Sequence, residues 1–227
     1  MKMHPITMRR TTPRQEGFSL VELLVVIAII SLLMVMAAPV VSSLMGAKTL
    51  DRGTYDLAGL LEQARNEAVT RQTYVWVGIK PVPTAHGLEI QVAIVCSKDG
   101  TGTNTDPSNL ANLSKVFHLS NLSLVAWSGL KASTQNLFTN ATPVSVSSNV
   151  AGIAFTSGQT QFQGTTLTFT PGGEVLLKGA AKSTDGFNEW IDVSFRLAHG
   201  TTVAPGADDA SVLIEGATGS VKIVCLR

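Results

Sequence analysis

The chain has 227 residues, of which 44% are hydrophobic and only 15% are charged, and its formal net charge is +1. A net charge so close to zero gives no general attraction to a polyanion, which speaks against a strongly basic nucleic-acid-binding protein. The small charged share and the mean hydropathy of +0.25 favour an apolar segment concentrated in one part of the chain.

The first 17 residues contain four basic residues and one acid and show no apolar periodicity. This composition is typical of a targeting leader. An apolar run over residues 18–45 follows, and a helix needs about 20 such residues to cross a bilayer. We place the membrane span at about residues 20–41. Because the basic residues precede the span, the positive-inside rule predicts a cytoplasmic N-terminus and an exported body.

Two other interpretations of this segment stay open. An ordinary secretory signal peptide would be cut near Met36-Ala37-Ala38, although the apolar run exceeds the usual roughly 7–15 residues. A plain signal anchor would not be cut at all. Neither interpretation explains Glu22, a carboxylate in the apolar helix, because such an acid at mid-bilayer costs about 2.5–3.5 kcal/mol. The positive end of the helix dipole reduces this cost, but the acid still needs a partner.

The segment from Gly17 to Ile27, GFSLVELLVVI, resembles the prepilin cleavage and methylation motif of type IV pilins and type II secretion pseudopilins. The resemblance implies that a membrane prepilin peptidase cuts between Gly17 and Phe18 on the cytoplasmic side and methylates the new amine of Phe18. That amine would be a counter-ion for Glu22 of a neighbouring subunit. In a low-dielectric helical bundle, such a pair would fix the register between adjacent helices during assembly.

Pro39 follows further along the same helix, as the motif that this segment resembles also has it. It carries no amide hydrogen, and its ring would clash with the carbonyl of Val35, so it predicts a kink near the end of the membrane span. A lipid-facing kink without a role is an equally open interpretation.

Residues 48–71 predict an amphipathic helix that packs along a sheet, since small and apolar residues recur at helical spacing among charged ones. Gly53 and Gly59 should weaken this helix locally. The stretch 57–71, above all its Ala64-Arg65-x-Glu67-Ala68 core, resembles minor pseudopilins and minor pilins of the GspH/FimT type. The residues expected to face the core are Leu50, Leu57, Leu61, Ala64 and Ala68.

Residues 73–227 predict an exported globular domain that is rich in β-structure. Helical periodicity ends, and short strand-like runs separated by Gly, Asn, Ser, Thr and Pro take over. The chain as a whole is therefore expected to be α+β: a long N-terminal membrane-anchoring helix, residues 18–72, and then two packed antiparallel sheets of the pilin-like kind. The expected strands are 74–79, 88–95, 116–125, 166–170, 174–177, 190–197, 212–215 and 221–226.

The connections between these strands have recognisable turn and loop compositions. Residues 171–173 (PGG) and 216–219 (GATG) predict hairpin turns. Segments 97–114 and 134–150 predict long loops, which either vary the partner surface of the subunit or are solvated filler. Asp208-Asp209 stands apart from any acidic calcium-binding loop and predicts solvated loop charges.

No motif of catalysis or metal binding is found in the sequence. The four histidines lie far apart, and there is no nucleophile elbow, phosphate-binding loop or dinucleotide fingerprint, so we expect no enzyme, no metal and no cofactor. Trp76, Trp127 and Trp190 lie in strand-like contexts and are expected to pack in the core or at its edge. Cys96 and Cys225 are too few for a disulfide framework. In an oxidising compartment they could form one disulfide with each other or remain two free thiols, and the sequence does not choose between these alternatives.

These features predict a structural minor pseudopilin that assembles into, or caps, the periplasmic pseudopilus of a type II secretion system, which exports folded proteins. The resemblance implies three kinds of partner: other pseudopilins or pilins, the prepilin peptidase and an inner-membrane assembly platform. The expected location is the bacterial inner membrane, crossed once, with the N-terminus in the cytoplasm and the globular domain in the periplasm.

Two other functions stay open: a minor type IV pilin that acts in pilus assembly or DNA uptake, and an unrelated binding module on a pilin-type anchor. DNA binding is disfavoured, because loss of the leader removes four cations and one acid and changes the formal charge from +1 to −2. Near the C-terminus, only Lys222 and Arg227 are available for phosphate contacts.

Overall fold

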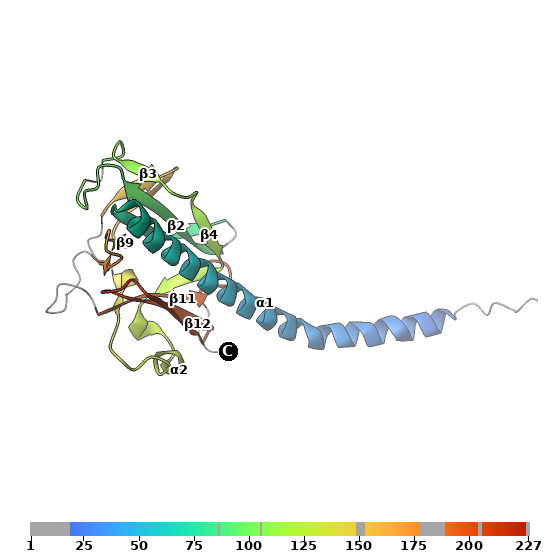
Figure 1. Cartoon of the computed structure of the whole chain (residues 1–227). Coiled ribbons are helices and arrows are strands. Elements are labelled where there is room, and N and C mark those ends of the chain that lie inside the picture. Colours follow the sequence, from blue (N-terminus) through green and yellow to red (C-terminus); the bar gives the residue numbers. More distant parts are fainter. Residues whose placement is uncertain are drawn as a thin grey trace, which may run out of the picture. The chain divides into compact units, whose positions relative to one another are not determined.

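The computed structural model of the chain describes residues 19–85, 87–104, 106–148, 153–177, 189–203 and 206–225, and within helix α1 it leaves the side chains of residues 35–47 undescribed (Figure 1). The predicted leader, with Gly17, and the predicted first mature residue, Phe18, therefore lie outside the described residues. The chain divides into two compact units, Met1–Leu44 and Met45–Arg227.

Helix α1 runs from Leu20 to Arg71 and contributes to both units. In the second unit it buries the apolar stripe that the sequence predicts. The helix ends at a left-handed residue, Gln72, whose φ is 51°, and there the Thr73 amide donates to the carbonyl of Ala68 over 3.1 Å. This ending satisfies one of the last helical carbonyls. The stripe residues, each at most 4% exposed, are Leu50, Leu57, Leu61, Ala64 and Ala68.

Sheet A is a six-stranded antiparallel sheet within the described residues, in the order β10-β9-β1-β2-β3, with β4 also paired to β2. The strands β3 and β4 occupy successive stretches of the same edge of β2. The bounds are β1 (Val75–Thr84), β2 (Gly87–Ser97), β3 (Leu110–Asn112), β4 (Phe117–Ser120), β9 (Thr166–Phe169) and β10 (Val175–Leu176).

Sheet B has five described strands in the order β13-β12-β11-β5, with β6 paired to β11. All its pairs are antiparallel except β11 with β6, which is parallel, so the expectation of purely antiparallel sheets fails at this one pair. The bounds are β5 (Leu122–Val125), β6 (Val144–Ser145), β11 (Trp190–Leu197), β12 (Asp209–Glu215) and β13 (Val221–Cys225).

Both predicted hairpin turns are present. Residues 171–173 connect the antiparallel strands β9 and β10, and residues 216–219 connect β12 and β13. The run expected as one strand over 116–125 is instead divided by Asn121, whose φ is 60°. On either side of this left-handed residue, β4 pairs in sheet A and β5 pairs in sheet B, so one continuous segment joins the two sheets.

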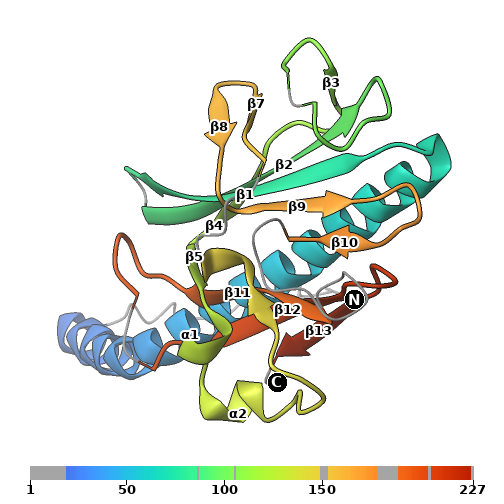
Figure 2. The same cartoon turned by 90° about the vertical axis from the view of Figure 1, so that its left-hand side faces the viewer.

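The main core lies between α1 and the two sheets, and Figure 2 shows sheet A and sheet B on either side of the helix. Buried side chains from all three layers form one cluster, which includes Leu61 of α1, Ile94 of β2 and Phe195 of β11. Strand β1 begins with five consecutive buried residues. A strand buried on both faces needs a cover on its second face.

Each sheet has such a cover. The hairpin of β7 (Phe155–Ser157) and β8 (Thr160–Phe162) packs on the outer face of sheet A through Phe162 and Trp76 (Figure 2). Residues 126–148, which we call the sheet B cover, pack on the outer face of sheet B through Trp127 and Phe138, and near their end they join the sheet itself, where β6 pairs with β11 and Val146 lies in the main core. The sheet B cover contains η1 (Trp127–Gly129), α2 (Ala132–Gln135), β6 and η2 (Val146–Ser148).

The two segments predicted as long loops therefore hold regular structure. Residues 97–114 contain β3, and residues 134–150 contain the second half of α2 together with β6 and η2 in their described part. These elements are two to four residues long, and their polar sequences carry no apolar periodicity. Contacts with the sheets determine their conformation, which is why the sequence pattern does not reveal them. All three tryptophans pack in or against buried clusters, as predicted.

Candidate assembly site

The first turn of α1 is the part of the described chain closest in sequence to the predicted processing site. The hydroxyl of Ser19 accepts a hydrogen bond from the amide of Val21 over 3.3 Å, and the Ser19 carbonyl accepts from the amide of Leu23 over 3.1 Å. Ser19 is thus the N-cap of the helix. Glu22 is the third helical residue, so the two form the Ser-x-x-Glu pattern of a capping box. Our sequence reasoning missed this local role, although the pattern was readable.

Beyond the first turn, the helix is apolar on all sides. Between Leu20 and Met34, twelve large apolar side chains are 45–81% exposed in the single chain, and Glu22 is exposed among them. A helix that is hydrophobic all round needs an apolar environment, because one that faces a core on only one side keeps a polar face.

Among the helical residues that the structure describes, no stretch is both long and apolar enough to qualify as a membrane crossing. The predicted span, about 20–41, includes residues 35–41, whose side chains are outside the description, and it stays a prediction. The helix is continuous across Pro39, and the predicted kink there also stays a prediction.

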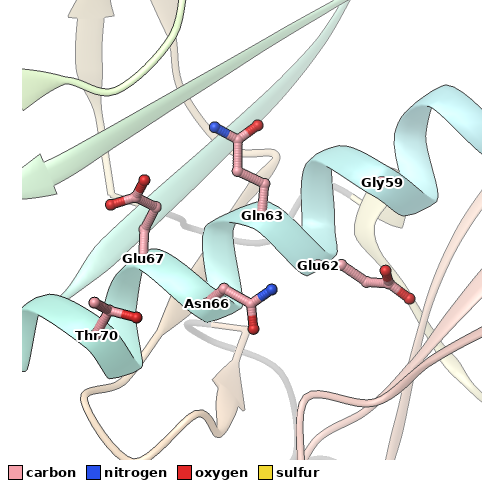
Figure 3. Close-up of a pocket in the computed structure, with 6 residues that line it drawn as sticks. All are labelled: Gly59, Glu62, Gln63, Asn66, Glu67 and Thr70. Carbon is pink, nitrogen blue, oxygen red and sulfur yellow. The ribbon is translucent and has the colours of Figure 1, made fainter.

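On the second unit, α1 exposes a polar face opposite its buried stripe. Figure 3 shows a surface hollow on this face, with the side chains of Glu62, Gln63, Asn66 and Thr70 projecting from the helix around it. The remaining lining residues are Gly59 and Glu67. Glu67 pairs with Arg71 one turn later, with 2.5 Å between Oε2 and Nε. The hollow brings together amide, carboxylate and hydroxyl side chains.

Arg65 connects α1 to both hairpin turns. Its Nε donates to the carbonyl of Thr218 over 2.7 Å. Gly173 and Gly219 have φ values of 89° and 67°, and a Cβ at either position would contact the Arg65 side chain. At Gly219 it would also collide with the carbonyl of Gly173. The arginine and the two glycines thus form one tightly packed corner, a structural role that accounts for Arg65 without a partner protein.

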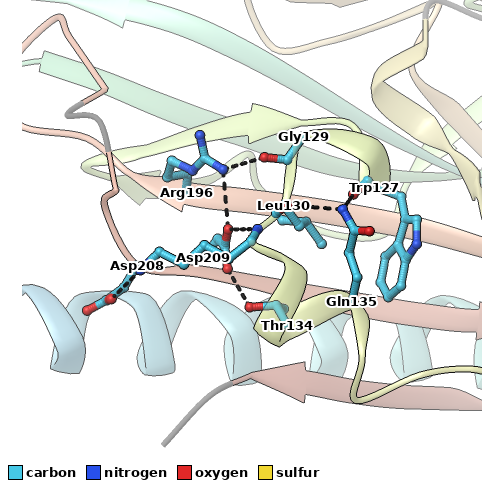
Figure 4. A network of polar contacts seen from close by, with 9 residues as sticks. Trp127, Gly129, Leu130, Thr134, Gln135, Arg196, Asp208 and Asp209 are labelled. Atoms are coloured by element: carbon cyan, nitrogen blue, oxygen red, sulfur yellow. Dashed lines mark hydrogen bonds and ion pairs between the residues drawn. The ribbon is translucent and has the colours of Figure 1, made fainter.

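Asp208 and Asp209 behave differently, which corrects the expectation that both are solvated loop charges. Asp208 is exposed and lies 3.0 Å from the Lys131 ammonium, but the carboxylate of Asp209 is fully buried on β12. It accepts from the Lys131 amide over 2.7 Å, from the Thr134 hydroxyl over 2.6 Å and from Arg196 over 3.3 Å (Figure 4). Arg196 also donates to the carbonyl of Gly129. Asp209 therefore fastens the sheet B cover to sheet B.

The two cysteines are free thiols in the structure. Cys96 is buried in the core on β2, close enough to Glu67 and Arg71 for their charges to act on its pKa. Burial is the main influence and raises the pKa of the Cys96 thiol. Cys225 is half-buried at the end of β13. The disulfide that the sequence left open is not formed in this arrangement.

The described residues contain no cluster of three or more histidine, cysteine or acidic side chains that could hold a metal ion. His118, on β4, lies 3.1 Å from Glu89 of β2, and this ring nitrogen and carboxylate form a surface contact at the edge of sheet A. His199 lies in the isolated bridge to Thr202.

The model of the prokaryotic N-terminal methylation motif matches residues 12–38 of the chain. The match includes Gly17, Phe18 and Glu22, and it means that the chain carries a type IV pilin-like N-terminal signal. Such a signal implies processing by a prepilin peptidase and assembly with other pilin-like subunits. Comparison with curated proteins and with solved structures gave no match.

Proposed function

We propose that the protein is a structural minor pseudopilin of the GspH/FimT type, which assembles into or caps the pseudopilus of a type II secretion system. The observation that carries this proposal is the methylation motif at residues 12–38, which includes the start of α1, where the helix is apolar all round and holds one acid, Glu22. A catalytic role has no comparable support, and we propose none.

The apolar helix suits two environments in turn. Before assembly, residues of about 20–41 would anchor the subunit in the inner membrane with its N-terminus in the cytoplasm and its second unit in the periplasm. During assembly, the same residues would leave the lipid and pack against the helices of neighbouring subunits. Exposed apolar side chains on every side of the helix fit both environments, because neither leaves a face in water.

Glu22 would have two roles, both of which the substitution Glu22→Ala removes at once. As the third residue of the helix, it is placed to complete the capping box with Ser19 within its own chain. As a carboxylate in an apolar bundle, it would pair with the amine of Phe18 in a neighbouring subunit and fix the register of the two helices. The first role concerns the folding of the helix, and the second concerns assembly.

The variants Glu22→Gln and Ser19→Ala separate these roles. Glutamine also serves in a capping box, so Glu22→Gln keeps the cap and removes only the charge, whereas Ser19→Ala removes the cap and keeps the charge. We expect Glu22→Gln and Glu22→Ala to be cleaved and inserted normally but to form at least about tenfold fewer crosslinks to other pilin-like subunits, which corresponds to about 1.4 kcal/mol. Ser19→Ala should assemble nearly normally.

Two measurements together test the proposal. Secretion of a reporter cargo and the number of surface pili, each measured with and without the subunit, distinguish a secretion pseudopilus from a type IV pilus. If the strain without the subunit loses its pili but secretes normally, the protein is a minor pilin and not a pseudopilin. If both Glu22 variants assemble and secrete as the unmodified protein does, the proposed register role of Glu22 is wrong.

A further inference from the structure

Asp192 is a buried carboxylate that the proposed assembly function does not use. It lies in the middle of β11, it is 0% exposed, and it faces the sheet B cover. One carboxylate oxygen accepts over 2.6 Å from the hydroxyl of Ser145, which lies opposite Asp192 on β6, the strand of the cover that pairs with β11, and the other accepts from Ser194 of β11 over 2.6 Å. The Ser145 hydroxyl in turn accepts from the amide of Trp127 over 2.8 Å. Asp192 thus connects sheet B to both ends of the cover.

Within the described residues, no cation contacts this carboxylate. The nearest charge on the same face of β11 is Arg196, which is engaged by Asp209 of β12. Lys131 of the cover pairs with Asp208 instead. Lys222 of β13 lies over the ring of Phe138, 5.1 Å from its centroid. Burial without a cation destabilises the ionised form of a carboxyl group relative to its protonated form.

A second observation shows where a proton on Asp192 would be accommodated. Ser211 of β12 lies directly opposite Ser194 in the register of the two strands, so both side chains are on the face that carries Asp192. The Ser211 hydroxyl is buried and has no hydrogen-bond partner, although such a group normally has one. A protonated Asp192 would donate to Ser194, and the Ser194 hydroxyl, released from the carboxylate, would donate to Ser211.

We propose that Asp192 is a proton-operated latch, which in its protonated form holds the sheet B cover closed on sheet B and which loosens the cover when it ionises. The protonated form satisfies Ser145, Ser194 and Ser211 at once. The ionised form leaves a charge without a cation in the protein interior and leaves Ser211 unsatisfied. Opening of the cover relieves both costs, because water then reaches the carboxylate and the hydroxyl.

The sign of the pH dependence follows from the shift of the Asp192 pKa. Burial raises the pKa to about 6 from the ordinary value of 3.8, even though Ser145 and Ser194 act in the other direction. The closed cover therefore binds the proton more tightly than the open one. Its extra stability is fully present below the ordinary value and is lost as the pH rises through about 6. Acid tightens the cover, and above about pH 6 the loosening levels off.

Hydrogen exchange of the full-length chain tests this directly, with the Trp127 amide as the reporter since it donates to Ser145 of the latch. After correction for the intrinsic exchange rate, we expect exchange about 25-fold faster at pH 7.5 than at pH 4.5, the factor that two pKa values of 3.8 and about 6 give for one proton. Asp192→Asn should abolish the pH dependence. Asp208→Asn, on the exposed aspartate that pairs with the cover, should preserve it.

A carboxyl-carbon NMR titration of Asp192 in the otherwise unmodified chain keeps the proposal testable if the Asn variant does not fold. We expect a midpoint near pH 6 and, in Ser211→Ala, a lower midpoint, because the protonated chain of hydroxyls loses its last acceptor. The latch is refuted if Asp192 titrates near its ordinary value, if Trp127 exchange keeps its pH dependence in Asp192→Asn, or if that dependence is missing from the unmodified chain. None of these outcomes bears on pilus or pseudopilus assembly.

Discussion

Gly53 and Gly59 lie six residues apart on α1 and have opposite surroundings. A Cβ at Gly53 would lie 2.5 Å from a methyl carbon of Leu122, so the absence of a side chain lets α1 approach the start of β5. A Cβ at Gly59 would contact nothing within 4 Å. The sequence predicts the same weakening at both positions, because helix propensity does not depend on what lies across the interface.

These surroundings predict opposite responses to the same substitution. Gly59→Ala should raise the free energy of unfolding by about 1 kcal/mol, the difference in helix propensity. Gly53→Ala gains the same propensity but must displace Leu122, and overpacking costs about 1–3 kcal/mol. Urea denaturation should therefore find Gly53→Ala at least about 1 kcal/mol less stable than Gly59→Ala. Equal stabilities would mean that Leu122 moves aside without cost.

The two thiols are also predicted to differ in reactivity. The thiolate is the reactive form, and burial both shields Cys96 and raises the pKa of its thiol, whereas Cys225 is half-buried on an edge strand. Alkylation of the native protein should modify Cys225 at least about tenfold faster than Cys96, and both should react fully after denaturation. The intact mass should be the same with and without a reductant. A mass two hydrogens lower without reductant would show that the two cysteines pair after all.

At the scale of the elements, sequence patterns succeeded where local chemistry determines the structure. The stripe from Leu50 to Ala68 follows helical spacing, and each hairpin turn has glycine at the positions that need a positive φ. Sequence patterns failed where contacts between segments far apart in the chain determine the structure. Nothing local to Asn121 says that β4 and β5 belong to different sheets, and the burial of Asp209 depends on a helix about 75 residues away in the chain.

The described part of residues 98–109, between β2 and β3, shows how a polar sequence without periodicity becomes ordered. Asp99 accepts hydrogen bonds from the hydroxyl of Ser97, from the amide and hydroxyl of Thr101 and from the side-chain amide of Asn104. Led by the Ser97 bond, these donors hold the pKa of Asp99 well below its ordinary value of 3.8. The contribution of the carboxylate to loop order is therefore present above the ordinary pKa of 3.8. It is lost as the pH falls through the lowered pKa of Asp99 in the folded protein.

Asp99→Asn should consequently loosen this segment at neutral pH, because an amide cannot accept as many hydrogen bonds as a carboxylate. Cleavage by trypsin after Lys98, whose ammonium is held by the carbonyl of Ser108, should be severalfold faster than in the unmodified chain. Asp106→Asn, which changes an exposed carboxylate of the same segment, is the control and should be cleaved at the original rate. If both variants are cleaved alike, the carboxylate of Asp99 does not order the loop.

For the molecule as a whole, the second unit is built from two sheets that share α1 and that each carry a separate cover. The α+β class with antiparallel sheets could be predicted from the order of the patterns, but the covers could not, because their contacts join segments that the sequence separates. For the candidate assembly site, the sequence was more informative than the structure. Its motif was recognisable from residues alone, whereas the structure adds the cap at Ser19, which gives Glu22 a second role.

The predicted cleavage after Gly17 would place the new N-terminus, Phe18, directly before Ser19, the N-cap of α1. We expect a mature chain of 210 residues, which is 227 less the 17 of the leader, and a methylated Phe18 at its start. Intact mass and N-terminal sequencing of membrane-extracted protein measure this.

Gly17→Leu should block cleavage but not insertion, because insertion depends on the apolar run and the peptidase needs a small residue at the cut. Since Ser19 already caps α1, the uncut variant should also keep the helix and the fold of the second unit, and only assembly should fail. A mature terminus near Ala38 would instead establish conventional secretion, and with the apolar helix removed no part of the proposed subunit role would survive.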